Sequence, residues 1–148
     1  MYRHILLPTD GSKLALKGAR AGIRLARALG ARVTAVYVAP VYVPPLYGEA
    51  MIYVGSASPK VWKKQIATLA AKAFAAVEGD ARKAGVPFAG YSVTDAQPWA
   101  GILRAARARR CDAIAMASHG RGGLGGLLLG SETARVLAHS KIPVIVIR

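Results

Sequence analysis

Glycine crowds the stretch 116–131, MASHGRGGLGGLLLGS, and this density is the first sign of chemistry in the chain. Six of the 16 glycines lie between Gly120 and Gly130. Glycine adopts positive φ readily and lets another group approach the backbone closely. Such a run is either a flexible linker or a loop that holds a ligand, and the flanking segments decide between the two.

An apolar run at 112–117 precedes the glycine loop, and a short helical pattern at 131–139 follows it. The first backbone N–H groups of a helix have no intrahelical partner, so a loop that leads from a strand into a helix can bind anions. We interpret the loop as phosphate-binding, with further hydrogen bonds from the hydroxyls of Ser131 and Thr133. These hydroxyls could also reach a phosphate-bound Mg²⁺, and Arg121 could lie over the phosphates.

Two other phosphate-binding motifs are excluded. A Walker A loop needs a lysine before its Ser or Thr, whereas Ser131 directly follows Gly130. The spacing Gly120-x-Gly122-x-x-Gly125 matches the dinucleotide fingerprint as a bare pattern. That fingerprint belongs to the first strand–helix turn and needs an acidic residue about 20 positions further on, which this sequence lacks.

The rest of the chain alternates apolar runs with helical patterns. We expect strands at 4–9, 32–39, 87–93, 112–117 and 143–147, and helices at 12–30, from Pro59 to Gly85, from Pro98, and at 131–139. Nearly continuous apolar strands that alternate with helices predict one doubly wound α/β domain over 1–148, with a parallel sheet and helices on both faces. The segment 40–58 holds three prolines and has no clear period, so we expect a long loop.

Composition gives a net charge of +14 and one cysteine, Cys111. The charge either favours polyanionic partners or reflects an Arg-rich proteome, so it assigns no function by itself. The lone cysteine excludes an intramolecular disulfide and fits a reducing compartment. No apolar run reaches the roughly 20 residues of a membrane-spanning helix. We therefore expect a cytoplasmic protein with no membrane association.

Four segments in order, ILLPTDGS, VTAVYV, MASHGRGGLGGLLLGSETARVL and IPVIVIR, resemble the universal stress protein family over essentially the whole chain. The G-x₂-G-x₉-G-S/T loop is that of its nucleotide-binding branch, with Ala117 in place of the first glycine. The resemblance implies an adenine nucleotide α-hydrolase-like sheet in strand order 3-2-1-4-5. It also implies ATP, with Mg²⁺ or Mn²⁺, at the switch point between the first and fourth strands, and a homodimer through the last strand, Val144–Ile147.

The same resemblance assigns the binding residues by position. Ribose and adenine would contact Pro8, Thr9, Asp10 and the backbone of Val38. Sugar and phosphates would contact Met116, Ala117, His119 and Gly120, and the triphosphate would be held by Gly130, Ser131, Glu132 and Thr133. Two of these residues have a second interpretation. Asp10 could instead form an Asx turn with Gly11, and the carboxylate of Glu132 could compete with the phosphates.

Three function classes follow. The first is a regulatory or sensing module in stress response that binds ATP and an unknown protein partner. The second is a slow ATPase or an enzyme that phosphorylates itself on Ser131 or Thr133. No catalytic residue and no metal site made by protein alone is predicted, because neither paired carboxylates nor a zinc spacing is present, although Asp10 and Ser131 could assist a nucleotide-bound Mg²⁺.

The third class is a basic protein associated with nucleic acid. It draws on a basic stripe at helical spacing in the predicted first helix, formed by Lys13, Lys17, Arg20, Arg24 and Arg27. The alternative for this stripe is a solvated helix face, and no stacking platform or nucleic-acid motif accompanies it.

Overall fold

The computed structural model describes residues 1–44, 58–118 and 129–148. Five strands form one parallel sheet: β1 (His4–Pro8), β2 (Arg32–Ala39), β3 (Phe88–Thr94), β4 (Ala113–Ala117) and β5 (Val144–Ile147). Four helices lie in the described ranges: α1 (Lys13–Leu29), α3 (Pro59–Lys83), α4 (Pro98–Ala108) and α5 (Ser131–His139). The sheet order is β3-β2-β1-β4-β5, so the predicted fold class and strand order are confirmed.

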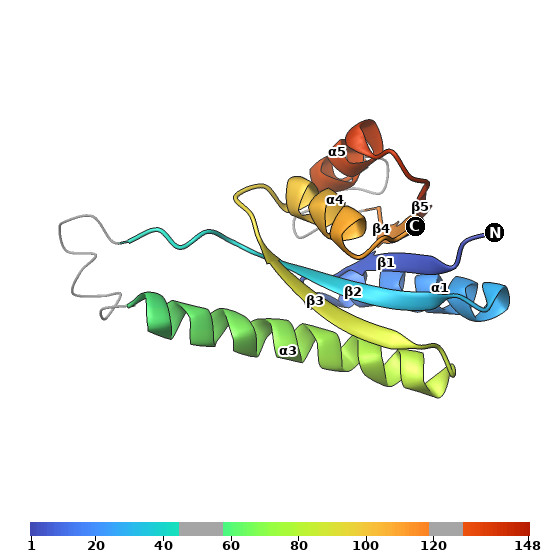
Figure 1. The fold of residues 1–148 in the computed structure, drawn as a ribbon, viewed down its shortest axis with the longest axis horizontal. Helices are drawn as coiled ribbons and strands as arrows, with labels where there is room; N and C mark the ends of the chain where they lie inside the picture. The colour runs from blue at the N-terminus through green and yellow to red at the C-terminus, as the bar shows by residue number, and fades with distance from the viewer. Residues whose placement is uncertain (45–57, 119–128) are drawn as a thin grey trace.

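Helices cover both faces of the sheet, α1 and α3 on one and α4 and α5 on the other (Figure 1). Successive side chains of a strand point to opposite faces, so Leu6 and Leu7 belong to different cores. Leu7 packs in the core under α1 and α3. Leu6 packs with Ile102 of α4 and Val136 of α5. Strands that are covered on both faces read as continuous apolar runs, which explains why no alternation is visible in the sequence.

Helix α1 has the predicted ends, but its buried face is different. The Ser12 side chain accepts from the Ala15 N–H at 3.1 Å, and Gly30 ends the helix at φ 63°. The predicted inward face was Leu14, Gly18, Ala21, Leu25 and Leu29, whereas the buried residues are Gly18, Ala19, Gly22, Ile23 and Ala26. Small residues let α1 approach the sheet closely, and the leucines lie at the edge of the contact.

Helix α3 buries only part of its predicted stripe of Trp62, Ile66, Leu69, Ala73, Val77 and Ala81. The last three are buried together with Ala70, but Leu69 is 52% exposed. The first turns of α3 extend beyond the strands, so they have no sheet to pack against (Figure 1). There the ring of Trp62 instead meets Tyr42, with ring centroids 6.0 Å apart.

The predicted loop 40–58 is only partly described. Residues 40–44 carry no helix or strand, and 45–57 lie outside the described residues. Within the ranges given above, no helix has the length and apolar character needed to cross a membrane.

Candidate functional site

The carboxyl ends of β1 and β4 lie side by side at the centre of the sheet. From β1 the chain continues through α1 to β2 on one side, while β4 lies on the other side. This reversal is a topological switch point, where open α/β sheets bind ligands. Helix α5 begins at Ser131, close to the end of β4, and its N-terminus therefore belongs to the same edge.

The end of β1 turns sharply into α1. Thr9 is buried, and its N–H donates to the Val36 carbonyl at 2.9 Å. Its hydroxyl accepts from the Gly11 N–H at 3.2 Å, and Gly11 has φ 80°. The Asp10 carboxylate accepts from the Ser12 N–H at 2.9 Å, which confirms the predicted Asx turn. The turn holds the exposed Asp10 side chain at the carboxyl edge of the sheet.

Val38 directs its backbone groups past the end of β1. Residues of β2 alternate in the neighbour to which their N–H and C=O point. The Val36 carbonyl accepts from Thr9 on the β1 side, and the Ala39 carbonyl accepts from Asp95 on the β3 side. Val38 has the same direction as Val36, but the β1 ladder ends at the pair Pro8–Val36. Its N–H and C=O thus lie beyond the last β1–β2 pair, at the switch point.

The two ends of the glycine loop are joined at the end of β4. The Gly130 N–H donates to the Ser118 carbonyl at 2.6 Å, and the Thr133 hydroxyl donates to the Ala117 carbonyl at 3.0 Å. Gly130 is the N-cap of α5, and no side chain of the described residues caps this helix. The first-turn N–H groups of a helix have no intrahelical partner and can bind an anion. The predicted contacts His119, Gly120 and Arg121 lie outside the described residues.

Ala117 fits where the family pattern has glycine. It is not among the described residues with positive φ, so its backbone does not require glycine. Its side chain is buried and faces Gly18 of α1, where an added Cβ would lie 2.7 Å from the Ala117 nitrogen. The glycine on the helix therefore provides the space that the alanine methyl occupies.

The Glu132 carboxylate is engaged with the first turn of α4. Its Oε2 accepts from the Trp99 backbone N–H at 2.8 Å, and its Oε1 lies 3.8 Å from the Arg135 Nη1. Gln97 makes no side-chain capping bond, so Glu132 caps α4 from another helix. Sequence reasoning missed this role, because no local pattern relates residues 33 positions apart.

One member of the basic stripe has an acidic partner in the fold. Arg20 Nε lies 2.8 Å from the Asp80 Oδ2, which joins α1 to α3. The sequence between Lys13 and Arg27 contains no acidic residue, so Arg20 finds its acidic partner on another helix.

In the described ranges, no cluster of three His, Cys, Asp or Glu side chains is placed to hold a metal ion.

A five-stranded parallel sheet in the order β3-β2-β1-β4-β5, covered by helices on both faces, defines the doubly wound class of α/β domains. The chain belongs to the universal stress protein family, whose model matches residues 1–148.

Two named relatives cover the whole chain. The Universal stress protein MJ0531 of Methanocaldococcus jannaschii is 30% identical over 151 residues, which span 100% of this chain and 83% of that protein. A universal stress protein of Thermus aquaticus, from the 3′ region of the QAH/OAS sulfhydrylase gene, is 31% identical over 149 residues and all of both chains.

Solved structures share the fold. MJ0577, whose biochemical function was assigned from its structure, has a TM-score of 0.74 and 25% identity, covering 99% of this chain and 96% of that one. A universal stress protein in complex with cAMP has a TM-score of 0.70 and 22% identity, covering 99% and 97%. An Archaeoglobus fulgidus universal stress protein in complex with dAMP has a TM-score of 0.66 and 20% identity, covering 99% and 98%.

Proposed function

We propose that this chain binds ATP at the switch point and acts as a regulatory module in stress response. The observation that carries the proposal is the start of α5, where the glycine loop closes on Ser118 and Gly130 leaves the first-turn N–H groups uncapped. The complexes of two neighbours with cAMP and dAMP support an adenine nucleotide as the ligand class.

The base and sugar would lie over the turn that follows β1. The N–H and C=O of Val38, which lie beyond the last pair of the β1 ladder, suit the hydrogen-bonding edge of adenine, and Asp10 suits the ribose hydroxyls. If the backbone recognises adenine, the selectivity for adenine over other bases comes from the shape of the site and from the order of its hydrogen-bond donors and acceptors. Met116, which is buried in β4 and packs with the α4 and α5 core, would support the sugar from below.

The triphosphate would lie at the α5 N-terminus. Thr133 donates its hydroxyl proton to Ala117, so its contribution to a phosphate would come from its backbone N–H. Ser131 is exposed and keeps its hydroxyl at the edge. Mg²⁺ or Mn²⁺ bound to the triphosphate would neutralise charge there, with Ser131 and Asp10 as the protein groups that could hold it.

Slow ATP hydrolysis or autophosphorylation is the second candidate function. The exposure of Ser131 favours it over the buried Thr133 as the phosphate acceptor. Phosphate incorporation that is lost in Ser131→Ala and kept in Thr133→Ser would support this function.

Calorimetric titration with Mg-ATP tests the site. Gly130→Asp places a carboxylate at an N-cap, where aspartate favours the helix but repels phosphate. We expect one site per chain in the wild type, loss of binding in Gly130→Asp, and retained binding in Gly79→Asp. Gly79 lies in α3 with nothing within 4 Å of an added Cβ, so it is the matched control.

Unchanged affinity in Gly130→Asp would contradict the proposed site. Nucleotide that copurifies with the protein would mask binding, so heat-denatured samples should be assayed for released nucleotide before titration.

We also propose a homodimer through β5. This strand forms one edge of the sheet, and its four apolar residues are only partly buried. The carbonyls of Pro143 and Ile147 accept from β4, so the N–H groups of Val144 and Val146 point outward. Val146→Pro removes an outward donor and leaves the β4 ladder intact. Sedimentation should show a dimer in the wild type and a monomer in this variant, and a dimer in both would contradict the interface.

A further inference from the structure

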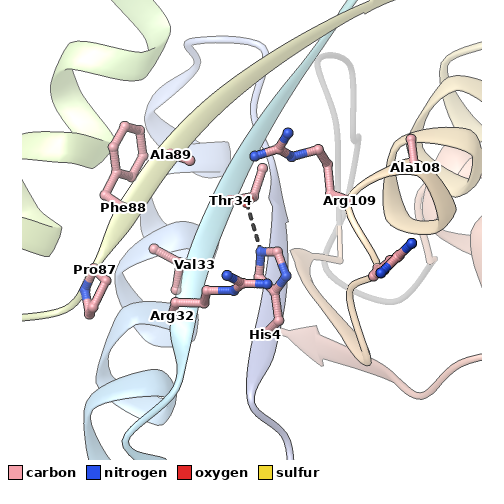
Figure 2. A pocket seen from close by; sticks show the side chains of 10 residues that line it. His4, Arg32, Val33, Thr34, Pro87, Phe88, Ala89, Ala108 and Arg109 are labelled. Carbon is pink, nitrogen blue, oxygen red and sulfur yellow. Dashed lines mark hydrogen bonds between the residues drawn. The ribbon is translucent and has the colours of Figure 1, made fainter.

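A pocket of about 390 Å³ lies at the amino-terminal edge of the sheet, opposite the candidate nucleotide site. It is lined by the starts of β1, β2 and β3 and by the turn that follows α4 (Figure 2). Because all strands are parallel, the two edges are separated by the length of the sheet. The pocket therefore uses none of the residues assigned to the nucleotide.

Strand alternation places polar side chains together on one face. His4 shares its face with Leu6, and Thr34 shares its face with Val36; both apolar residues lie in the core under α4 and α5. Arg32 has the same parity as Thr34, so its side chain also starts from that face. The register pairs His4 with Arg32 in neighbouring strands, which brings the two side chains together.

Three arginines surround the pocket, and none of its lining residues is acidic. Arg32 comes from β2, while Arg109 and Arg110 come from the turn after α4. Figure 2 shows the Arg32 guanidinium beside the His4 ring and the Arg109 guanidinium on the other side of Thr34. Arg109 is held by the Tyr91 ring, whose centroid lies 5.4 Å from its Cζ.

His4 forms the buried base of the pocket. It is 5% exposed, and its Nε2 lies 2.8 Å from the Thr34 Oγ1. Its Nδ1 is buried and makes no well-formed hydrogen bond with a described residue, although the Arg110 backbone faces the ring and raises its pKa.

The turn that carries two of the arginines has a strained backbone. Arg110 has φ 53°, and it is the one non-glycine residue with positive φ in the described part of the chain. A side chain in this region costs free energy, and such residues concentrate at binding sites and switches. The strain here accompanies the placement of Arg109 and Arg110 at the pocket.

We propose that this pocket binds a small phosphate-bearing anion, independently of the nucleotide site. Guanidinium groups bind phosphate oxygens through paired, charge-assisted hydrogen bonds. The volume falls within the roughly 300–1,000 Å³ that ligand pockets have. A free diphosphate and a sugar phosphate both offer phosphate oxygens to the arginines, and the experiments below distinguish these two ligands.

Titration with inorganic pyrophosphate tests the proposal. The Gly130→Asp background removes anion binding at the α5 N-terminus, so any remaining heat reports another site. We expect saturable binding that is weakened about tenfold or more in Arg32→Ala and in Arg109→Ala, as loss of a charge-assisted hydrogen bond implies. Arg107→Ala is the matched control, because Arg107 lies one turn earlier on α4 and does not line the pocket.

Equal weakening in the Arg107→Ala control would overturn the proposal, since it would show diffuse attraction to the basic surface. Absence of saturable binding in the parent background would also overturn it. A parallel titration with ribose 5-phosphate separates the ligand sources. Tighter binding of the sugar phosphate supports an organic phosphate, and tighter binding of pyrophosphate supports an inorganic one.

The His4 ring gives a second readout by NMR. The charged groups that face it are Arg32 from β2, Arg109 and Arg110 from the turn after α4, and Asp112 before β4. Pyrophosphate should shift the His4 ring resonances and raise the pKa of His4, because a bound anion offsets the charges of Arg32 and Arg109, which lower it. Saturable heat with unmoved His4 signals would place the anion elsewhere and overturn the proposal.

Discussion

Glu132 Oε2 accepts a hydrogen bond from the Trp99 backbone N–H at 2.8 Å, and this bond ties the first turn of α5 to the first turn of α4. The carboxylate sits at the positive end of the α4 dipole, where a negative charge is favourable. The carboxylate of a residue beside the proposed triphosphate therefore already caps a second helix.

Glu132→Ala should lower the free energy of unfolding by about 1 kcal/mol, the usual effect of losing a helix cap. Affinity for Mg-ATP should be unchanged or higher, because a carboxylate near the phosphates is removed. Urea unfolding followed by tryptophan fluorescence and calorimetry measure the two effects. Glu78→Ala is the control, since its exposed pair with Arg82 contributes little. Reduced ATP affinity at unchanged stability would show that Glu132 holds the ligand instead.

Gly18→Ala should destabilise the protein by about 1–3 kcal/mol, as overpacking does. Its Cβ would lie 2.7 Å from the Ala117 backbone nitrogen, so α1 must move away from β4. Gly79→Ala should instead stabilise by about 0.5–1 kcal/mol, because it is a helical glycine with open space around it. Thermal unfolding of both variants gives the comparison. If both variants lost the same stability, helix propensity, and not the close approach of α1 to β4, would determine the effect of Gly18→Ala.

Stability should fall as pH drops below about 6.5. Burial first, and then Arg32, hold the pKa of His4 below its ordinary value of 6.5. Below that value the unfolded chain therefore binds a proton more readily than the folded chain, so protonation favours unfolding. Unfolding free energies from pH 8 to pH 5 should show this slope in the wild type and a smaller one in His4→Gln. His139→Gln, on the exposed end of α5, should keep the wild-type slope.

Cys111 should resist thiol reagents in the folded protein. Burial, with a smaller effect of Asp112, raises the pKa of the thiol to about 11. Little thiolate is present at pH 8, and the side chain is only 7% exposed. Labelling with a chromogenic disulfide should be slow in buffer and fast in denaturant. Rapid labelling of the native protein would mean that the turn after α4 opens readily.

Local signals in the sequence located most elements of the fold. The predicted strand at 32–39 and helix at 131–139 have the observed bounds, and Ser12 and Gly30 end α1 as predicted. The wrong predictions concern the buried faces of two helices. The leucines of α1 and Leu69 of α3 are less buried than helical spacing indicates. Periodicity identifies an apolar side, but the distance to the sheet decides which residues reach it.

The grouping of Thr9, Asp10, Val38 and Ser131 at one edge also followed from the sequence. In a parallel sheet every strand ends at the same edge, so residues after successive strands must meet there. The resemblance to universal stress proteins supplied the roles proposed for them, and the fold supplied a reason for Val38: β1 ends before it.

The sequence by itself determined the alternation of elements, the parallel sheet and the glycine loop at its carboxyl edge, because each of these depends on neighbours along the chain. Tertiary structure alone decided the bond from Glu132 to Trp99, the pairing of Arg20 with Asp80, 60 positions away, and the meeting of Arg32 with Arg109 around His4. Such contacts depend on how segments distant in the sequence pack together, and the spacing of residues in a single sequence does not predict that packing.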